Sequence, residues 1–147
     1  MSKKHPVIAV TGSSGAGTTT VKHAFHDVFH RLDVNPVVIE GDSFHRYNRV
    51  EMREAIAKAA AEGKTISHFG PEGNDFGSLE ALFRQYGETG TGKMRYYVHD
   101  DAEAELRGSA PGTFTPWQDI PSGTDLLFYE GLHGGVKTEE HDVANYV

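Results

Sequence analysis

The residues best suited to chemistry stand near the start of the chain, where glycines and threonines are concentrated. Four residues separate Gly12 from Gly17, and Thr18 and Thr19 follow. This spacing agrees with the phosphate-binding pattern G-x-x-x-x-G-K-[ST] at every fixed position except one, because Thr18 stands where the pattern has lysine. Glycine suits such a loop because side chains would block a phosphate and because some loop residues need a positive φ.

The segments on either side of these glycines support a phosphate-binding loop. Val7–Val10 is an apolar run that predicts a buried strand, and an amphipathic helical pattern follows the glycines. A strand, a glycine loop and a helix start direct backbone N–H groups toward a phosphate, whereas a plain glycine turn is the alternative. We expect the apolar helix face to lie on a sheet; it consists of Val21, Ala24, Phe25, Val28, Phe29 and Leu32. The predicted ATP-binding residues are Gly12, Ser13, Ser14, Gly15, Ala16, Gly17, Thr18, Thr19 and Thr20.

Two further predicted strands end in carboxylates. Val37–Ile39 leads into Asp42, and Leu126–Tyr129 leads into Glu130. Strand, helix, strand with a phosphate loop at the first crossing begins a parallel α/β sheet, whose ligands lie beyond the carboxyl ends of the strands. Asp42 is therefore a candidate base for an acceptor hydroxyl, although an aspartate in this position could instead cap a helix. Glu130 and the Thr19 hydroxyl are candidate magnesium ligands.

Basic residues follow Asp42 directly in an otherwise acidic chain. They are His45, Arg46, Arg49 and Arg53. Arg49 and Arg53 are one helical turn apart, and arginine pairs suit a phosphate that the acceptor already carries. Surface ion pairs with Glu51 and Glu54 are the alternative explanation.

Periodicity and turn residues predict the remaining segments. Gly87–Lys93 also fits G-x-x-x-x-G-K, but no helix follows it, so we interpret it as a loop between helix and strand. The other expectations are a helix ending near Gly63, a loop over Lys64–Gly77, a helix from the capping residue Ser78 to Tyr86, a strand over Met94–His99, a solvated acidic segment from Asp100 to Glu105, and a surface loop over Gly108–Gly123.

Length and composition restrict the class of protein. The 147 residues suit one domain, and 37% hydrophobic and 24% charged residues are typical of a soluble globular protein. A net charge of −7 argues against nucleic-acid and membrane surfaces, and there are no cysteines and no long apolar run. We therefore expect a cytoplasmic protein.

Five segments together resemble bacterial phosphoribulokinase over essentially the whole chain. They are Val7–Thr20, Ile39–Arg46, Tyr86–Gly90, Tyr97–Asp101 and Leu127–Gly134. The resemblance implies an α/β P-loop kinase fold with a mainly parallel sheet and flanking helices. It also implies MgATP-dependent phosphorylation of ribulose 5-phosphate at its 1-hydroxyl, which gives ribulose 1,5-bisphosphate for the Calvin cycle.

The same resemblance assigns roles to residues. Asp42 would be the catalytic base and Glu130 the second acid of the site, while the sugar phosphate would contact His45, Arg49, Tyr97 and His99. Bacterial members are oligomeric and respond to NADH and AMP, so we expect a homo-oligomer with these effectors. The family carries a lid with further basic residues and a metal-binding aspartate after the point where this sequence stops. We therefore expect residues 1–147 to be the N-terminal part of one kinase domain.

Other functions remain open at this point. A nucleoside or pantothenate kinase would share the glycine loop and a similar base, but the basic cluster favours a phosphorylated acceptor. A non-catalytic nucleotide-binding protein is a second possibility, made less attractive by the absence of an N-K-x-D motif. A dinucleotide-binding oxidoreductase fails because G-x-G-x-x-G starting at Gly15 would need glycine at Thr20.

Overall fold

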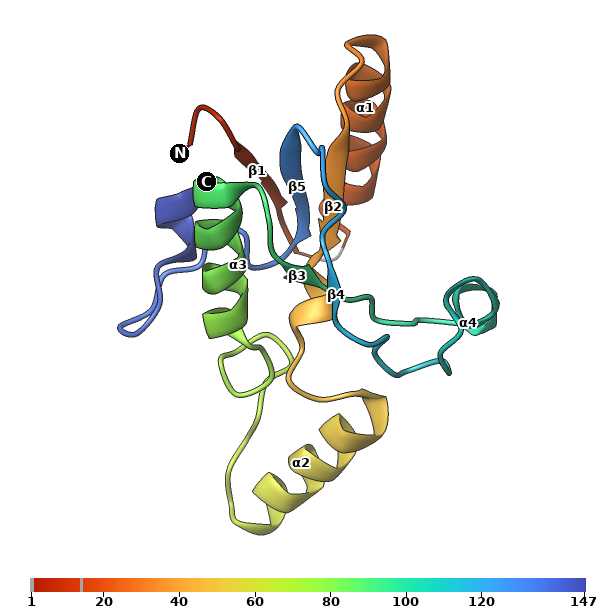
Figure 1. Cartoon of the computed structure of the whole chain (residues 1–147). Helices are drawn as coiled ribbons and strands as arrows, with labels where there is room; N and C mark the ends of the chain where they lie inside the picture. The colour runs from red at the N-terminus through yellow and green to blue at the C-terminus, as the bar shows by residue number, and fades with distance from the viewer. Residues whose placement is uncertain (1, 14) are drawn as a thin grey trace.

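A three-stranded parallel sheet organises the structure, a computed structural model that describes residues 2–13 and 15–147. Strand β5 (Leu126–Gly131) lies between β1 (Val7–Thr11) and β2 (Pro36–Glu40), and both neighbours run parallel to it. Each strand is an apolar run, as expected where helices cover both faces of a sheet. The carboxyl ends of the three strands consequently meet at one edge (Figure 1).

Helices α1 (Thr18–Arg31) and α3 (Phe76–Thr89) cover opposite faces of the sheet. Alternate residues of β5 point to the two sides, so Phe128 packs against Phe25 and Phe29 of α1, with ring centroids 5.2 and 5.6 Å away. Tyr129 packs instead against Phe83 of α3, at 5.5 Å. This arrangement confirms the predicted parallel α/β sheet with flanking helices.

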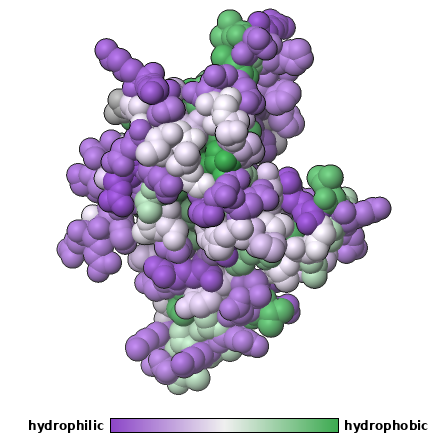
Figure 2. Space-filling view, in the orientation of Figure 1, coloured by the Kyte–Doolittle hydropathy of each residue, from purple (hydrophilic) through white to green (hydrophobic). Residues whose placement is uncertain are grey.

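The predicted apolar face of α1 is only partly buried. Phe29 is buried and Phe25 half-buried, whereas Val21, Val28 and Leu32 are 41, 47 and 67% exposed. The six apolar residues extend around a larger part of the helix surface than the sheet can cover, so the residues at the edges of this apolar face stay in solvent. Apolar atoms are accordingly visible at the free end of this helix in Figure 2.

A short 3-10 helix, η1 (Gly41–Phe44), continues directly from β2 and leads to α2 (Arg49–Ala61). The start of α2 is fixed by a capping box, in which the Asn48 side chain accepts from the Glu51 backbone and Glu51 accepts from the Asn48 backbone. Helix α2 projects away from the sheet (Figure 1). At the other end of the chain, η2 (Val143–Tyr146) packs on α3.

Two predicted boundaries were wrong. Asp75, not Ser78, caps α3: its carboxylate accepts from the Ser78 backbone at 3.0 Å, so the helix starts at Phe76. The expected strand Met94–His99 is regular only in β3 (Lys93–Met94), which pairs with β4 (Gln118–Asp119). Beyond Met94 the chain forms scattered backbone hydrogen bonds and one isolated bridge with the loop around Thr113, so the pairing is too irregular to make a continuous strand.

The acidic run is largely exposed to solvent, as expected. It forms a helix, α4 (Asp101–Arg107), because the Asp100 carboxylate caps it by accepting from the Glu103 backbone at 2.9 Å. Part of the expected surface loop Gly108–Gly123 forms β4. Throughout residues 2–13 and 15–147, every helix is too short or too polar to span a lipid bilayer.

Candidate functional site

A cleft of about 600 Å³ opens where the carboxyl ends of the strands meet the glycine loop. Its walls come from the loop after β1, the start of α1, the ends of β2 and β5, and two loops that follow later in the chain. The lining residues are Gly12, Ser13, Gly15, Thr18, Thr19, Lys22, Glu40, Gly41, Asp42, His45, His68, Phe69, His99, Glu130, Gly131, Leu132 and His133. The candidate base, the candidate metal ligands and most of the glycine loop therefore share one cavity.

The glycine loop has the backbone that its sequence predicts. Gly15 and Gly17 have φ values of 83° and 86°, and Gly17 is the residue from which α1 begins. A Cβ at either position would meet no atom within 4 Å, so backbone conformation rather than crowding requires glycine here. Ala16, Gly17 and Thr20 belong to the same segment but do not line the cleft, and Ser14 lies outside the described residues.

Thr18, at the position of the missing lysine, points toward the end of β5. Its hydroxyl donates to Glu130 at 2.7 Å. Lys22, one helical turn further on, lies 3.9 Å from Glu40 and 4.0 Å from Glu130. Glu40 and Glu130 are register partners on neighbouring strands, so the lysine offsets two adjacent negative charges. Sequence reasoning missed Lys22 because the motif has no lysine at that spacing.

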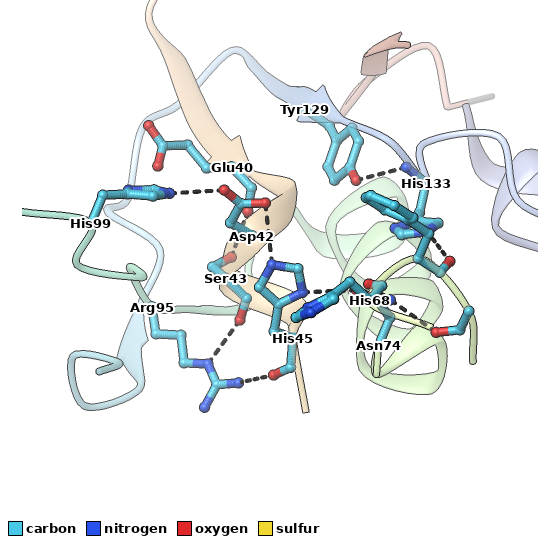
Figure 3. A network of polar contacts seen from close by, with 12 residues as sticks. Glu40, Asp42, Ser43, His45, His68, Asn74, Arg95, His99, Tyr129 and His133 are labelled. Carbon is cyan, nitrogen blue, oxygen red and sulfur yellow. Dashed lines mark hydrogen bonds and ion pairs between the residues drawn. The ribbon is translucent and has the colours of Figure 1, made fainter. Parts of the chain in front are cut away.

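Asp42 does not cap a helix. Glu40 is the N-cap residue of η1 and makes no side-chain cap, while the Asp42 carboxylate faces the cleft. One of its oxygens lies 3.3 Å from His45 Nε2 and the other 2.8 Å from His99 Nε2 (Figure 3). The capping alternative is therefore wrong, and Asp42 is the centre of a polar network.

Histidine contacts set the charges in this network. The His45 hydrogen bond, opposed by burial and helped by His99, lowers the pKa of Asp42 from 3.8 to about 2. The bond to Asp42 raises the pKa of His45 above 6.5, although burial opposes it. Burial lowers the pKa of His99, but its hydrogen bonds to Asp42 and Glu103 outweigh that effect and the pKa is raised. Asp42 is thus held ionised, and its contacts favour the protonated form of both imidazoles.

Residues from distant loops hold His45 in place. Its Nδ1 lies 2.9 Å from the side-chain oxygen of Asn74, a fully buried residue. The Asn74 amide in turn donates to the carbonyls of His68 and Gly70. The Arg95 guanidinium donates to the carbonyls of Ser43 and His45 at 2.8 and 2.9 Å and stacks on aromatic rings. These contacts fix the segment that carries Asp42 (Figure 3).

A second, smaller cavity of about 270 Å³ adjoins the cleft and shares His45 and His68 with it. Arg49, Arg53 and Tyr97 line this cavity. Among the described residues neither arginine forms the ion pair with Glu51 or Glu54 that was the alternative explanation for the basic cluster. Arg49 donates instead to the backbone carbonyl of His99 at 2.9 Å. The ring of Tyr97 lies between the two histidines of the network, 5.9 Å from His45 and 5.0 Å from His99.

Tyr129 supports the floor of the cleft. Its hydroxyl accepts from the His133 backbone at 3.1 Å, and burial raises its pKa to about 12. His133 reaches across to the Phe69 carbonyl at 2.8 Å, and burial lowers its pKa below 6.5. The loop around Phe69 is thereby attached to the segment after β5. The spacing of His133 and Phe69 in the sequence does not predict this contact.

The chain is similar to known proteins in both sequence and structure. The sequence matches the Phosphoribulokinase / Uridine kinase family over residues 7–147. It is 60% identical over 147 residues to "Phosphoribulokinase" of Nitrobacter vulgaris, covering 99% of this chain and 51% of that protein. It is also 60% identical to "Probable phosphoribulokinase" of Escherichia coli (strain K12), covering 100% of this chain and 51% of that protein.

A solved structure named "phosphoribulokinase from Rhodobacter spheroides" superposes with a TM-score of 0.88 at 50% identity. The superposition covers 99% of this chain and 50% of that one. The chain therefore spans about half the length of the relatives that it matches.

Proposed function

The chain belongs to the Phosphoribulokinase / Uridine kinase family, and from that premise we propose that the full-length protein transfers the γ-phosphoryl group of ATP to the 1-hydroxyl of ribulose 5-phosphate. The products are ADP and ribulose 1,5-bisphosphate, so the reaction serves the Calvin cycle. In this step the acceptor oxygen bonds to the γ-phosphorus, the bond from that phosphorus to the ADP oxygen breaks, and the hydroxyl proton leaves to a base.

One observation carries this proposal: a carboxylate that contacts two imidazoles just after the end of β2 faces the glycine loop across the cleft. Asp42, which bears this carboxylate, is the group positioned to accept the hydroxyl proton. A carboxylate that two imidazoles hold ionised is in the protonation state that a base needs. Its low pKa makes it a weak base while both imidazoles contact it.

The phosphorylated end of the acceptor is proposed to bind beside Asp42. His45, Arg49, Tyr97 and His99 would contact it, since the smaller cavity is lined by His45, Tyr97 and the Arg49 guanidinium, which is held against the His99 carbonyl at the adjoining cleft. A cationic cavity suits a phosphate dianion better than an uncharged nucleoside. This charge is the reason to prefer a sugar phosphate over a nucleoside as acceptor.

The glycine loop fits the phosphates of ATP, because its two positive-φ glycines leave open space at the start of α1. Thr19 and Glu130 would hold Mg²⁺, for which hydroxyl and carboxylate oxygens are suitable ligands. Bound there, the ion would offset the negative charge of the phosphates. Among the described residues no three His, Asp or Glu side chains converge on one metal position, so phosphate oxygens would complete the coordination.

Four properties stay predictions. These are a homo-oligomeric state, a cytoplasmic location, regulation by NADH and AMP, and a single kinase domain that continues beyond residues 1–147.

The direct test is a comparison of acceptors with the full-length protein. Magnesium ATP is supplied with ribulose 5-phosphate, ribulose or uridine, and the products are identified by ³¹P NMR. We expect a new phosphomonoester only with ribulose 5-phosphate. Phosphorylation of uridine would favour a nucleoside kinase, and ATP binding without transfer to any acceptor would favour a non-catalytic nucleotide-binding protein.

A further inference from the structure

Glu103 holds His99 at two places, a contact that the proposed roles leave unused. One carboxylate oxygen of Glu103 accepts from the His99 backbone N–H at 2.9 Å and lies 3.0 Å from the ring Nδ1. The other oxygen lies 3.3 Å from the same nitrogen. The opposite ring nitrogen, Nε2, lies 2.8 Å from Asp42. The imidazole is therefore placed between two carboxylates.

The protonation of the ring follows from these partners. Carboxylates only accept hydrogen bonds, so both ring nitrogens must donate if both contacts are to be made. Glu103 thus favours the imidazolium and, when the ring is neutral, competes with Asp42 for its one proton. The contact also orients the ring, because the backbone and side chain of His99 are bound by the same carboxylate.

We propose that Glu103 is a positioning residue, which aims the Nε2–H of His99 into the cleft and keeps the ring cationic for the anionic group of the acceptor. The identity of that acceptor rests on the proposed function. The orientation and charge of His99 do not, since they follow from contacts within the chain.

A purely structural role for Glu103 makes a different prediction. Glu103 lies in the first turn of α4, where an acidic side chain also stabilises the helix start. Glu105 lies on the same helix, is exposed, and forms no ion pair within residues 2–13 and 15–147. Glu105→Gln therefore removes the same charge from α4 without touching His99, and serves as the matched control.

The first measurement follows the His99 imidazole by ¹³C NMR from pH 5 to 9 in the full-length protein without ligands, with its signal assigned through His99→Gln. The charged and titratable groups around His99 are Asp42, Glu103 and His45, the Arg49 guanidinium on its backbone carbonyl, and the Tyr97 ring at 5.0 Å. We expect the pKa of His99 to fall in Glu103→Gln and to stay at the wild-type value in Glu105→Gln. An unchanged His99 titration in Glu103→Gln, or an equal fall in both variants, overturns the proposal.

The second measurement is kinetic. At pH 8, Glu103→Gln should raise KM for ribulose 5-phosphate roughly tenfold, the effect of about 1.4 kcal/mol from one charge-assisted hydrogen bond. The increase should shrink at pH 6.5, because a larger fraction of the His99 rings in the variant is protonated there than at pH 8, and KM for ATP should stay constant. A KM increase of the same size at both pH values overturns the proposal. Absence of sugar kinase activity in the wild type would contradict the proposed function but leave the NMR result to decide the role of Glu103.

Discussion

At the scale of single residues, the Asp42 network has a defined dependence on pH. The pKa of Asp42 is lowered to about 2, so its stabilising contribution is present above 3.8 and is lost as pH falls toward 2. The pKa values of His45 and His99 are raised above 6.5, so their contribution is present below 6.5 and is lost as pH rises through the raised values. The network therefore stabilises the fold most between about pH 4 and 6.5.

Asp42→Asn should reduce this pH dependence, since the contact of His99 with Glu103 remains. Urea midpoints of wild type and variant, measured from pH 3 to 8, should differ most near pH 5 to 6 and converge toward pH 8. The difference between the two midpoints is used because burial lowers the pKa of His133. This shift changes stability with pH in the opposite direction to the raised pKa values of His45 and His99, and it does so in both proteins. A difference that stays constant across the whole range would mean that Asp42 is not coupled to the histidines.

Gly17 permits a second prediction at this scale. A β-branched side chain can adopt its φ of 86° only with backbone strain. Gly17→Val should abolish ATP binding in calorimetry, since both the backbone and the space at the start of α1 are altered. Gly63→Val is the matched control: Gly63 has a φ of 73° and equally open surroundings, but lies at the far end of α2. Equal loss of ATP binding in both variants would point to general unfolding.

At the scale of elements, the ends of β2 and β5 approach each other too closely for side chains. A Cβ on Gly41 would lie 2.5 Å from the Tyr129 hydroxyl and 3.1 Å from Gly131 Cα. These glycines let the two strand ends, and hence Asp42 and Glu130, enter one cleft. Close backbone approach rather than flexibility is the reason for glycine here.

Gly41→Ala should consequently lower the free energy of unfolding by about 1–3 kcal/mol, as overpacking typically does. Gly135→Ala, where a Cβ would meet no atom within 4 Å, should change it little. Adding Tyr129→Phe to Gly41→Ala removes the nearest clashing atom and should restore part of the loss in chemical denaturation. If Gly41→Ala and Gly135→Ala have the same midpoint, the strand ends are less tightly packed than the structure indicates.

Elements with strong local patterns were predictable from the sequence, and contacts between loops were not. The apolar runs of β1, β2 and β5 and the glycine loop located Asp42 and Glu130, because each depends on neighbours in the chain. The cap of α3 was misplaced by three residues, since Asp75 and Ser78 are both good caps. Arg95 and Asn74 could not be assigned, because their partners lie 50 and 29 residues away in irregular segments.

At the scale of the whole molecule, each outer strand of the described sheet has one edge that pairs with no other strand. β1 and β2 form its two edges within residues 2–13 and 15–147, and the matched relatives are about twice as long. Exposed edges of a parallel sheet favour association, and a site open to water catalyses phosphoryl transfer poorly.

Residues 1–147 expressed alone should therefore turn over ATP with ribulose 5-phosphate far more slowly than the full-length protein, and should associate at high concentration. A coupled ADP assay and light scattering on the same preparations check both expectations. Turnover within a few-fold of the full-length protein would show that this part of the chain contains the complete catalytic machinery.

The most direct test of the account is the kinetic effect of Asp42→Asn in the full-length protein, measured beside Arg49→Ala and the exposed control Asp27→Asn. If Asp42 is the base, kcat should fall by about 10²- to 10⁴-fold with KM for ATP nearly unchanged. Arg49→Ala should instead raise KM for ribulose 5-phosphate much more than KM for ATP, and Asp27→Asn should match the wild type. A folded Asp42→Asn protein with wild-type kcat would contradict the account.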